Sequence, residues 1–389
     1  MRLIPVNDLE DGMVLGKSIY TFNNKLMLGA GFRLTAAFRA KLVERGMTHI
    51  YIIEEGTEDV VPEDIISDEI RFQARSRIAD TAEKIQNHFN IKDISRQKVF
   101  DLIQNGYLQK VNLTQDMKNV VVEILNDISA AGAGFLNTAM FKSKDSYSTD
   151  HAINVTILSI LIGKKYGFTK SELVDLALGS FLHDFGKIVI EKMKPASAEL
   201  SEELLSEHPT FGYLIVHNSR NASPIVSQIV NQHHENQDGS GYPIGLIGEN
   251  LPPTSSVKRN TKNTIYRLAE ICHVANAFDN IAMNPHDDTP VSPGDAIKQL
   301  VLGAGTKYNK HIVSTLTKVV PSYPVGAFVK IRYLLDSSLI GYRGVVARNN
   351  EQHLNKPQII LLFDRANKRI PPRLIDTSKL KNVELELIL

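Results

Sequence analysis

The chain has 389 residues, of which 43% are hydrophobic and 22% are charged, and its formal net charge is +1. This length predicts two or three folded domains, and the near-zero charge excludes recruitment of nucleic acid or an anionic membrane by a global field. The single cysteine, Cys272, excludes a disulfide framework and a thiolate zinc cluster. The apolar stretch from Ala152 to Gly163 is too short to span a bilayer. We therefore expect a cytoplasmic protein with no DNA partner and no membrane insertion.

Residues 1–66 predict a small α/β domain that ends in a linker. Four short apolar runs predict strands, at 13–16, 18–22, 25–28 and 49–53. Asn23–Asn24 favours a hairpin turn between two of these strands. Thr35 is expected to cap a helix that ends at Gly46. The last ten residues of the domain, 57–66, are acidic and predict the linker.

Three further regions follow along the chain. Residues 67–140 have a helical pattern and predict a connecting region. Helical segments punctuated by Gly and Pro dominate 141–318, which predicts the largest domain. Residues 319–389 carry β-rich runs at 328–331 and 358–363 and predict a small β-barrel or sheet. The sequence therefore predicts a mainly α protein with a small N-terminal α/β unit and a small C-terminal β domain.

Histidines are concentrated in the largest predicted domain. Five of the twelve lie in contexts that suggest one site: His151, His183, His208, His233 and His234. Asp184 follows His183 directly, and Lys187 lies four residues after His183. On a helix, this spacing would put the side chains of His183 and Lys187 on one face. Imidazole nitrogens and carboxylate oxygens suit Fe, Mn, Zn, Ni and Co ions. A carboxylate such as Asp184 can bridge two ions, which together can clamp a phosphoryl group and activate a bridging hydroxide.

The loop after His233 and His234 is rich in glycine, which permits unusual backbone angles and close approach of a ligand. The candidate substrate-binding residues of this loop are Asp238, Gly241, Tyr242 and Pro243. A plain turn is the alternative for this loop. A lone buried histidine is likewise more often structural than a ligand. The joint pattern of histidines, aspartate and glycine loop favours a metal site with substrate beside it.

The chain resembles the HD-GYP subfamily of HD-superfamily phosphohydrolases in three motifs that occur in the family's order, at 183–187, 233–235 and 238–243. His151 and His208 stand where that family has further ligand histidines, and the similarity spans residues 147–285. The resemblance implies an all-helical HD-type catalytic domain over residues 141–318. It also implies hydrolysis of a cyclic dinucleotide, with cyclic di-GMP as first candidate, to linear pGpG or to GMP.

The resemblance also implies a cofactor and residue roles. Two divalent transition-metal ions are expected, with Fe or Mn first and Ni, Zn or Co as alternatives. Their ligands would be His151, His183, Asp184, His208, His233, His234 and Asn276. Asp184 would bridge the ions, and Lys187 would bind phosphate and stabilise developing charge, so that both are catalytic. Gly241 and Tyr242 would shape the floor of the substrate site.

The sequence departs from the family at three places. Asn276 stands where the family has its last ligand, an aspartate, and Asp279 follows three residues later. A neutral amide is a weaker ligand than a carboxylate. Tyr147 stands where members with three metals have a glutamate, so two ions are expected at most. The family's Arg-Pro-Tyr element is replaced by the run 283–288, and the basic segment 258–262 is an alternative contact for the substrate.

Alternatives to cyclic di-GMP hydrolysis therefore stay open. With Asn276 in the metal shell, the domain is either a phosphodiesterase or a catalytically weak regulatory protein that binds a cyclic dinucleotide. A third hypothesis is an HD phosphohydrolase that acts on another nucleotide. The N-terminal domain carries no catalytic constellation, so it would sense, regulate or form a homodimer, and the sequence does not choose among these roles.

Overall fold

The computed structural model describes residues 1–21, 25–88, 95–106, 113–131, 147–193, 200–257, 262–282, 291–335 and 337–388. Several sequence predictions lie outside these ranges, namely the turn at 23–24, most of the basic segment 258–262 and the run 283–288. Tyr147 begins a helix, but its side chain is also outside the described part. Within the described part, the mainly α fold with strands near both ends confirms the predicted fold class.

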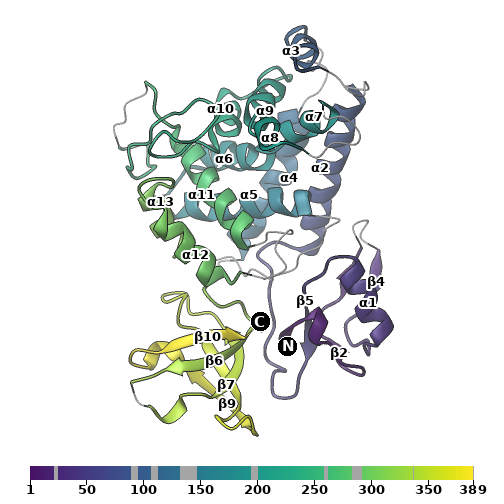
Figure 1. The fold of residues 1–389 in the computed structure, drawn as a ribbon, viewed down its shortest axis with the longest axis vertical. Coiled ribbons are helices and arrows are strands. Elements are labelled where there is room, and N and C mark those ends of the chain that lie inside the picture. Colours follow the sequence, from purple (N-terminus) through teal and green to yellow (C-terminus); the bar gives the residue numbers. More distant parts are fainter. Residues whose placement is uncertain are drawn as a thin grey trace.

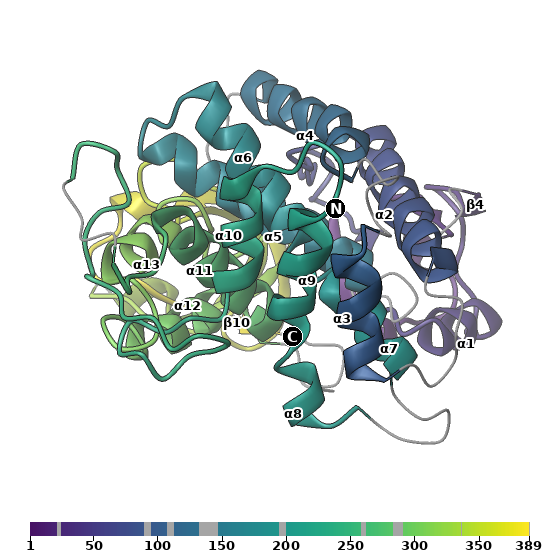
Figure 2. The same ribbon diagram turned by 90° about the horizontal axis from the view of Figure 1, so that it is seen from above.

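The helical domain surrounds one central helix. Its described helices are α2 (Asp68–His88), α3 (Arg96–Gln104), α4 (Leu113–Ala130), α5 (Tyr147–Lys165), α6 (Lys170–Leu182), α7 (Gly186–Met193), α8 (Glu202–Leu205), α9 (His208–His217), α10 (Pro224–Gln232), α11 (Arg267–Ala282), α12 (Pro293–Leu302) and α13 (Lys310–Leu316). Helix α5 lies in the middle, between α2 and α4 on one side and α11 to α13 on the other (Figure 1, Figure 2). It is apolar around most of its circumference from Ala152 to Gly163, which explains its burial. None of the helices described has both the length and the apolarity needed to cross a membrane.

The chain turns sharply between α6 and α7. Helix α6 ends at Leu182, residues 183–185 form a turn, and α7 begins at Gly186. A Cβ atom on Gly186 would stand 1.9 Å from the carbonyl oxygen of His208 and 2.6 Å from the amide nitrogen of Gly212. The turn thus lets α7 pack directly on α9. The prediction that His183 and Lys187 share one helix face is wrong, because this turn separates them.

The N-terminal unit combines five short strands with one helix. Its elements are β1 (Arg2–Pro5), β2 (Val14–Leu15), β3 (Ile19–Tyr20), β4 (Leu26–Leu28), α1 (Ala36–Glu44) and β5 (His49–Ile53). Antiparallel strands in the order β1-β5-β2 form one sheet, and β3 and β4 form a second. Thr35 precedes α1 as predicted, but its side chain makes no capping hydrogen bond. The sequence does not predict β1, because this run is short and ends in a proline.

The C-terminal unit is a five-stranded antiparallel sheet, which confirms the predicted small β domain. Its strands are β6 (Phe328–Tyr333), β7 (Arg343–Arg348), β8 (Gln358–Phe363), β9 (Arg369–Asp376) and β10 (Glu384–Ile388). They lie in the order β10-β6-β7-β8-β9. The cross-strand series Phe328, Val345 and Ile360 is buried and forms part of one face of the core.

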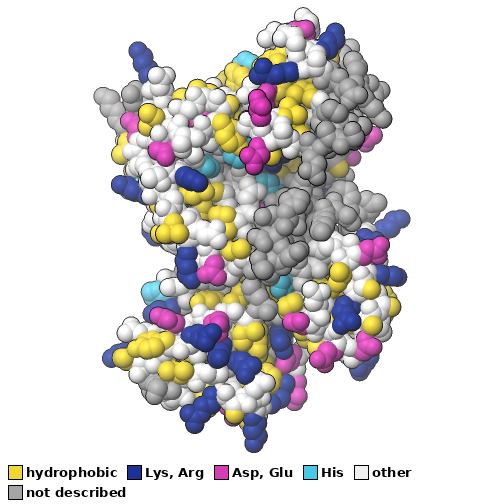
Figure 3. Space-filling view, viewed as in Figure 1, with side chains coloured by type: hydrophobic (Ala, Val, Ile, Leu, Met, Phe, Trp, Pro, Cys, Tyr) yellow, Lys and Arg dark blue, Asp and Glu magenta, His cyan; other side chains and the backbone are white. Residues whose placement is uncertain are grey.

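The N-terminal and C-terminal units pack against each other. The amide of Leu3 donates to the carbonyl of Gly326 at 2.7 Å, and the hydroxyl of Tyr51 donates to the carbonyl of Val325 at 3.1 Å. Val60, from the segment that the sequence predicts as a linker, is buried in the core of the C-terminal sheet. The two units lie side by side below the helical domain (Figure 1). Charges of both signs are interspersed over this face of the molecule (Figure 3), as the small net charge leads one to expect.

Candidate metal centre

Four helices bring six of the seven predicted ligands together. His151 comes from α5, His183 and Asp184 from the turn after α6, His208 from the first residue of α9, and His233 and His234 from the turn after α10. These six residues form two groups of donor atoms. The groups are His151, His183 and Asp184, and His208, His233 and His234. Within each group the donor atoms lie within 4.8 Å of one another.

Asp184 lies between the two groups. Its Oδ2 atom is 3.7 Å from Nε2 of His151 and 3.5 Å from Nε2 of His183. Its Oδ1 atom is 3.3 Å from Nε2 of His208 and 4.0 Å from Nε2 of His233. One carboxylate thus presents each of its oxygens to a different pair of imidazoles, which is the arrangement that a bridging ligand requires.

Backbone carbonyls orient three of the imidazoles. Nδ1 of His183 donates to the carbonyl of Ser180 at 2.7 Å. His208 and His233 make the same contact with the residue three positions earlier, at 2.6 and 2.7 Å. A carbonyl oxygen only accepts, so each Nδ1 carries the proton and each Nε2 keeps a lone pair in the neutral ring. Such fixed partners are the usual way in which proteins orient histidine ligands.

A carboxylate orients the fourth imidazole. Nδ1 of His151 lies 2.7 Å from Oδ2 of Asp279, on α11. Oδ1 of Asp279 accepts a hydrogen bond from the amide of Asn154 at 3.0 Å. Both oxygens of Asp279 are therefore engaged, and this residue supports His151 from the side away from Asp184. The sequence places Asp279 near the site but does not predict this partnership, because the two residues lie 128 positions apart.

The protonation states suit metal binding. Burial lowers the pKa of His183 to about 4, and burial also holds the pKa of His233 and His234 well below the usual value. Burial alone would raise the pKa of Asp184, but Lys187 and His183 hold it well below its usual range. Neutral imidazoles around an ionised carboxylate are the forms that coordinate a divalent ion.

Three observations show that the donors fit divalent transition-metal ions. Nε2 of His151 lies 3.2 Å from Nε2 of His183, and Nε2 of His208 lies 3.1 Å from Nε2 of His233. With each Nδ1 protonated, these contacts set lone pair against lone pair, and a cation bound by both nitrogens would relieve the repulsion. Oδ1 of Asp184 is buried and makes no hydrogen bond of good geometry. Imidazole and carboxylate together suit Fe, Mn, Co, Ni or Zn.

Lys187 contacts this cluster from a partly exposed position. Its ammonium group is 2.7 Å from Oδ2 of Asp184, and 42% of its side chain is exposed. An ammonium group has three donors, so Lys187 keeps hydrogens for a bound anion while it contacts Asp184.

The glycine loop is held by a buried carboxylate. Glu235 is fully buried and accepts hydrogen bonds from the amides of Ile244, Gly245 and Leu246, at 2.8, 3.0 and 2.8 Å. A Cβ atom on Gly241 would stand 2.4 Å from the carbonyl of His234, so the loop folds tightly back on the ligand segment. The sequence includes Glu235 in a motif but does not predict its role, because its three partners are backbone amides, which do not depend on residue type.

Tyr242 is the loop residue that meets the histidines. Its ring stacks on His234 with centroids 4.6 Å apart, and the peptide bond to Pro243 is cis. Burial raises the pKa of Tyr242 to about 12, so its hydroxyl stays protonated and can donate a hydrogen bond. Asp238 is exposed, and its carboxylate accepts hydrogen bonds from the amide and hydroxyl of Ser240. In this structure Asp238 therefore stabilises the loop.

Asn276 is buried on α11, one turn before Asp279. Its side-chain oxygen accepts a hydrogen bond from Asn280 at 2.8 Å. That oxygen retains a second lone pair. His273, on the same helix, is buried beside Tyr308 and bonds to the backbone of Glu235.

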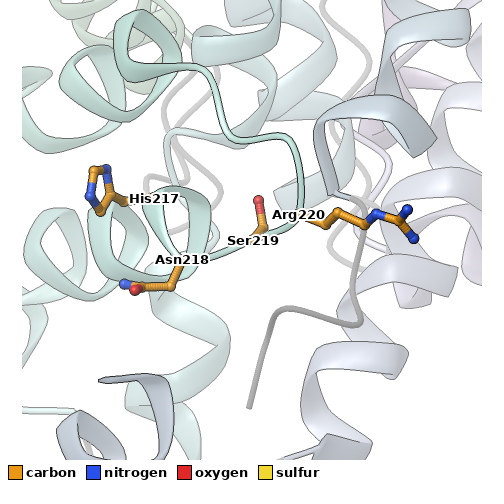
Figure 4. Close-up of a pocket in the computed structure, with 4 residues that line it drawn as sticks. All are labelled: His217, Asn218, Ser219 and Arg220. Atoms are coloured by element: carbon orange, nitrogen blue, oxygen red, sulfur yellow. The ribbon is translucent and has the colours of Figure 1, made fainter. Parts of the chain in front are cut away.

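A pocket of about 490 Å³ lies elsewhere on the helical domain. It is lined by His217, Asn218, Ser219 and Arg220, at and after the end of α9 (Figure 4). His208 begins the same helix, so the pocket lies about 13 Å along the helix axis from that ligand. The pocket is therefore separate from the metal centre.

Comparison with known proteins identifies the helical domain. Residues 136–312 match the HD domain family. Over 294 residues, the chain is 24% identical to a cyclic di-GMP phosphodiesterase of Pseudomonas aeruginosa, a match that covers 73% of this chain and 65% of that protein. It is 26% identical over 194 residues to a cyclic di-GMP phosphodiesterase of Borreliella burgdorferi, covering 49% of this chain and 47% of the relative.

A third relative is named for a different substrate. The chain is 23% identical over 215 residues to a 3'3'-cGAMP-specific phosphodiesterase of Vibrio cholerae, covering 54% of this chain and 38% of the relative. The chain thus spans less than two thirds of the length of each of these three proteins. The helical part of the chain contains an HD domain over residues 136–312. The family match and the cyclic di-GMP phosphodiesterases among the relatives support the HD-GYP resemblance seen in the sequence.

Proposed function

We propose that the chain is a metal-dependent phosphodiesterase that hydrolyses a cyclic dinucleotide, with cyclic di-GMP as the first candidate. The position of Asp184 carries the proposal, because each of its oxygens faces a different pair of histidines. Ligation by His151, His183, Asp184, His208, His233 and His234, with Asn276 as a weaker ligand, is part of the proposal. The curated relatives named above support the substrate class.

Divalent ions bound there would supply Lewis acidity and lower the pKa of water. The residues of this chain bind and orient the substrate around them. Lys187 donates to a phosphoryl oxygen and stabilises the charge that develops on it. The protonated hydroxyl of Tyr242 donates a hydrogen bond, and the absent side chain at Gly241 lets the backbone lie close to the ligand segment. Pro243 and Asp238 keep this loop in place beside the substrate.

The same proposal includes the identity of the ions, the product, the location of the protein and the role of its N-terminal unit. Fe or Mn are the first candidate ions, since the donors are imidazoles and a carboxylate without thiolate. The reaction ends at linear pGpG or at GMP. A cytoplasmic location is in keeping with the single buried cysteine. The N-terminal unit would sense a signal, regulate the catalytic domain or form a homodimer.

The test combines metal analysis with product analysis. Protein purified without oxygen is analysed by elemental mass spectrometry, and its products from cyclic di-GMP and from hybrid cyclic GMP-AMP are separated by chromatography. We expect nearly two ions per chain and a linear product that disappears with chelator. Lys187→Ala should lower kcat by about 100-fold or more, whereas Lys170→Ala, an exposed lysine at the start of α6, should not.

Two outcomes would change the conclusion. Tight binding of cyclic dinucleotide without product, although both ions are present, would refute the enzyme and favour a receptor. Turnover of the hybrid dinucleotide in preference to cyclic di-GMP would keep the reaction and change the substrate. The Vibrio cholerae relative is the observation that favours including this second substrate.

A further inference from the structure

Two arginines of α2 contact polar side chains on both sides of His151. Arg71 and Arg75 lie four residues apart on α2, and their partners Asp150 and Asn154 lie four residues apart on α5. Residues at this spacing share one helix face, so the contacts form two successive rungs between the helices. Helix α2 runs along the side of the helical domain and packs on α4, α5 and α7 (Figure 1, Figure 2).

The first rung anchors the start of α5. Nε and Nη2 of Arg75 both lie 2.7 Å from Oδ1 of Asp150. The two side chains are only 22% and 18% exposed, so water screens this pair less than it screens an ordinary surface pair. Asp150 directly precedes His151. The pair therefore fixes the backbone from which the ligand projects.

The second rung reaches the imidazole through side chains alone. Nη1 of Arg71 lies 3.4 Å from Oδ1 of Asn154, and the amide nitrogen of Asn154 donates to Asp279 at 3.0 Å. Asp279 in turn contacts Nδ1 of His151 at 2.7 Å. Because arginine only donates, Arg71 keeps the oxygen of Asn154 turned toward α2 and its nitrogen turned toward Asp279. This series of contacts orients the imidazole whose Nε2 faces Asp184.

Helix α2 also begins where the N-terminal unit ends. Ile65 and Ile66 are buried in the core of the helical domain, and the amide of Ser67 donates to the carboxylate of Asp127 on α4 at 2.9 Å. Helix α2 starts at the next residue, Asp68. Residues 65–67 are therefore fixed to the helical domain, and they hold the start of α2 in place on α4.

We propose that Arg71 and Arg75 are positioning residues for His151, and that α2 thereby supports ion binding in the His151–His183 half of the metal centre. This inference rests on the proposed metal-dependent function, because it concerns one of the same ligands. Its readout is the affinity for an ion, which is measured without substrate. Outer partners of histidine ligands typically change metal affinity by about 10-fold to 100-fold when they are removed.

The test uses the full chain after removal of metal. Binding of Mn²⁺ is measured by titration calorimetry, bound ions are counted by elemental mass spectrometry, and the Tm of the metal-free protein reports folding. The Arg71→Gln/Arg75→Gln double variant should weaken one of two Mn²⁺ sites by about 10-fold or more and leave the other unchanged. Arg75→Lys should retain most of the affinity. Arg77→Gln, at an exposed arginine of the same helix, is the matched control.

Three outcomes separate the possibilities. Two Mn²⁺ sites of wild-type affinity in the double variant would overturn the inference. Equal weakening of both sites, with a lower Tm than the Arg77→Gln control, would also overturn it and assign the arginines a role in folding only. A wild-type protein that binds two ions but hydrolyses no cyclic dinucleotide would refute the proposed function alone, because the Mn²⁺ affinities would still decide whether α2 positions His151.

Discussion

Replacement of Gly186 by alanine should displace a predicted metal ligand without changing any donor atom. The new Cβ would stand 1.9 Å from the carbonyl oxygen of His208, about 1.5 Å short of the 3.4 Å at which ordinary contacts begin. The neighbouring amide of Gly212 lies 2.6 Å away, so neither atom is the end of a flexible side chain. The first turn of α9 must therefore withdraw from α7. Overpacking of this kind costs about 1–3 kcal/mol, and a ligand shift near 1 Å can lower turnover by about 100-fold.

The assay compares Gly186→Ala with Gly29→Ala. In the control, the nearest atom to the new Cβ is a methyl group of Leu26 at 4.0 Å. We expect the Gly186 variant to lose about 1–3 kcal/mol in free energy of unfolding by urea and to bind fewer ions per chain by elemental mass spectrometry. Gly29→Ala should match the wild type in both measurements. A Gly186→Ala protein with wild-type stability and metal content would refute the idea that the close contact of α7 and α9 positions His208.

Three further predictions concern the loop, the ions and pH. Glu235→Ala should lower the free energy of unfolding by about 3 kcal/mol, because three backbone amides lose their acceptor; an unchanged stability and KM would contradict this role. Chelator should remove the ions in two steps. The ion at His151 and His183 should leave first, because the other half of the centre has three imidazoles. Simultaneous release of both ions, measured by elemental mass spectrometry, would contradict this order. Burial lowers the pKa of His273 to about 4 from 6.5, so the unfolded chain binds more protons between these values. His273 alone should therefore cost the metal-free protein up to about 3 kcal/mol as pH falls from 6.5 to 4. His273→Asn should reduce the slope of stability against pH in urea titrations at several pH values, and a slope equal to that of the wild type would argue against this role.

The sequence predicts the chemistry of the centre better than its geometry. His183 and Asp184 are adjacent, as are His233 and His234, so residue type and spacing are enough to indicate a metal site. The same local reading puts His183 and Lys187 on one helix, and this is wrong. The turn at 183–185 exists because Gly186 must pack on α9, and a contact between distant segments leaves no mark in local periodicity.

The sequence also does not predict which groups hold the ligand side chains in place. The carbonyls that orient His183, His208 and His233 belong to the backbone. Every residue has a backbone carbonyl, so the residue types in the sequence do not reveal these contacts. Asp279 reaches His151 across 128 positions. The roles of Arg71 and Arg75 likewise follow only from the packing of α2 on α5, although their spacing of four residues is visible in the sequence.

By itself, the sequence determined the mainly α fold class, the strands near both ends and the histidine and aspartate donors, because composition, periodicity and adjacency are local properties. Tertiary structure alone decided that Asp184 stands between two pairs of imidazoles and that each Nδ1 has a fixed partner. It also decided that the N-terminal unit packs on the C-terminal sheet, through contacts such as Tyr51 with Val325, 274 positions apart. These features depend on which distant surfaces bury each other, and that free energy is set by the whole folded chain.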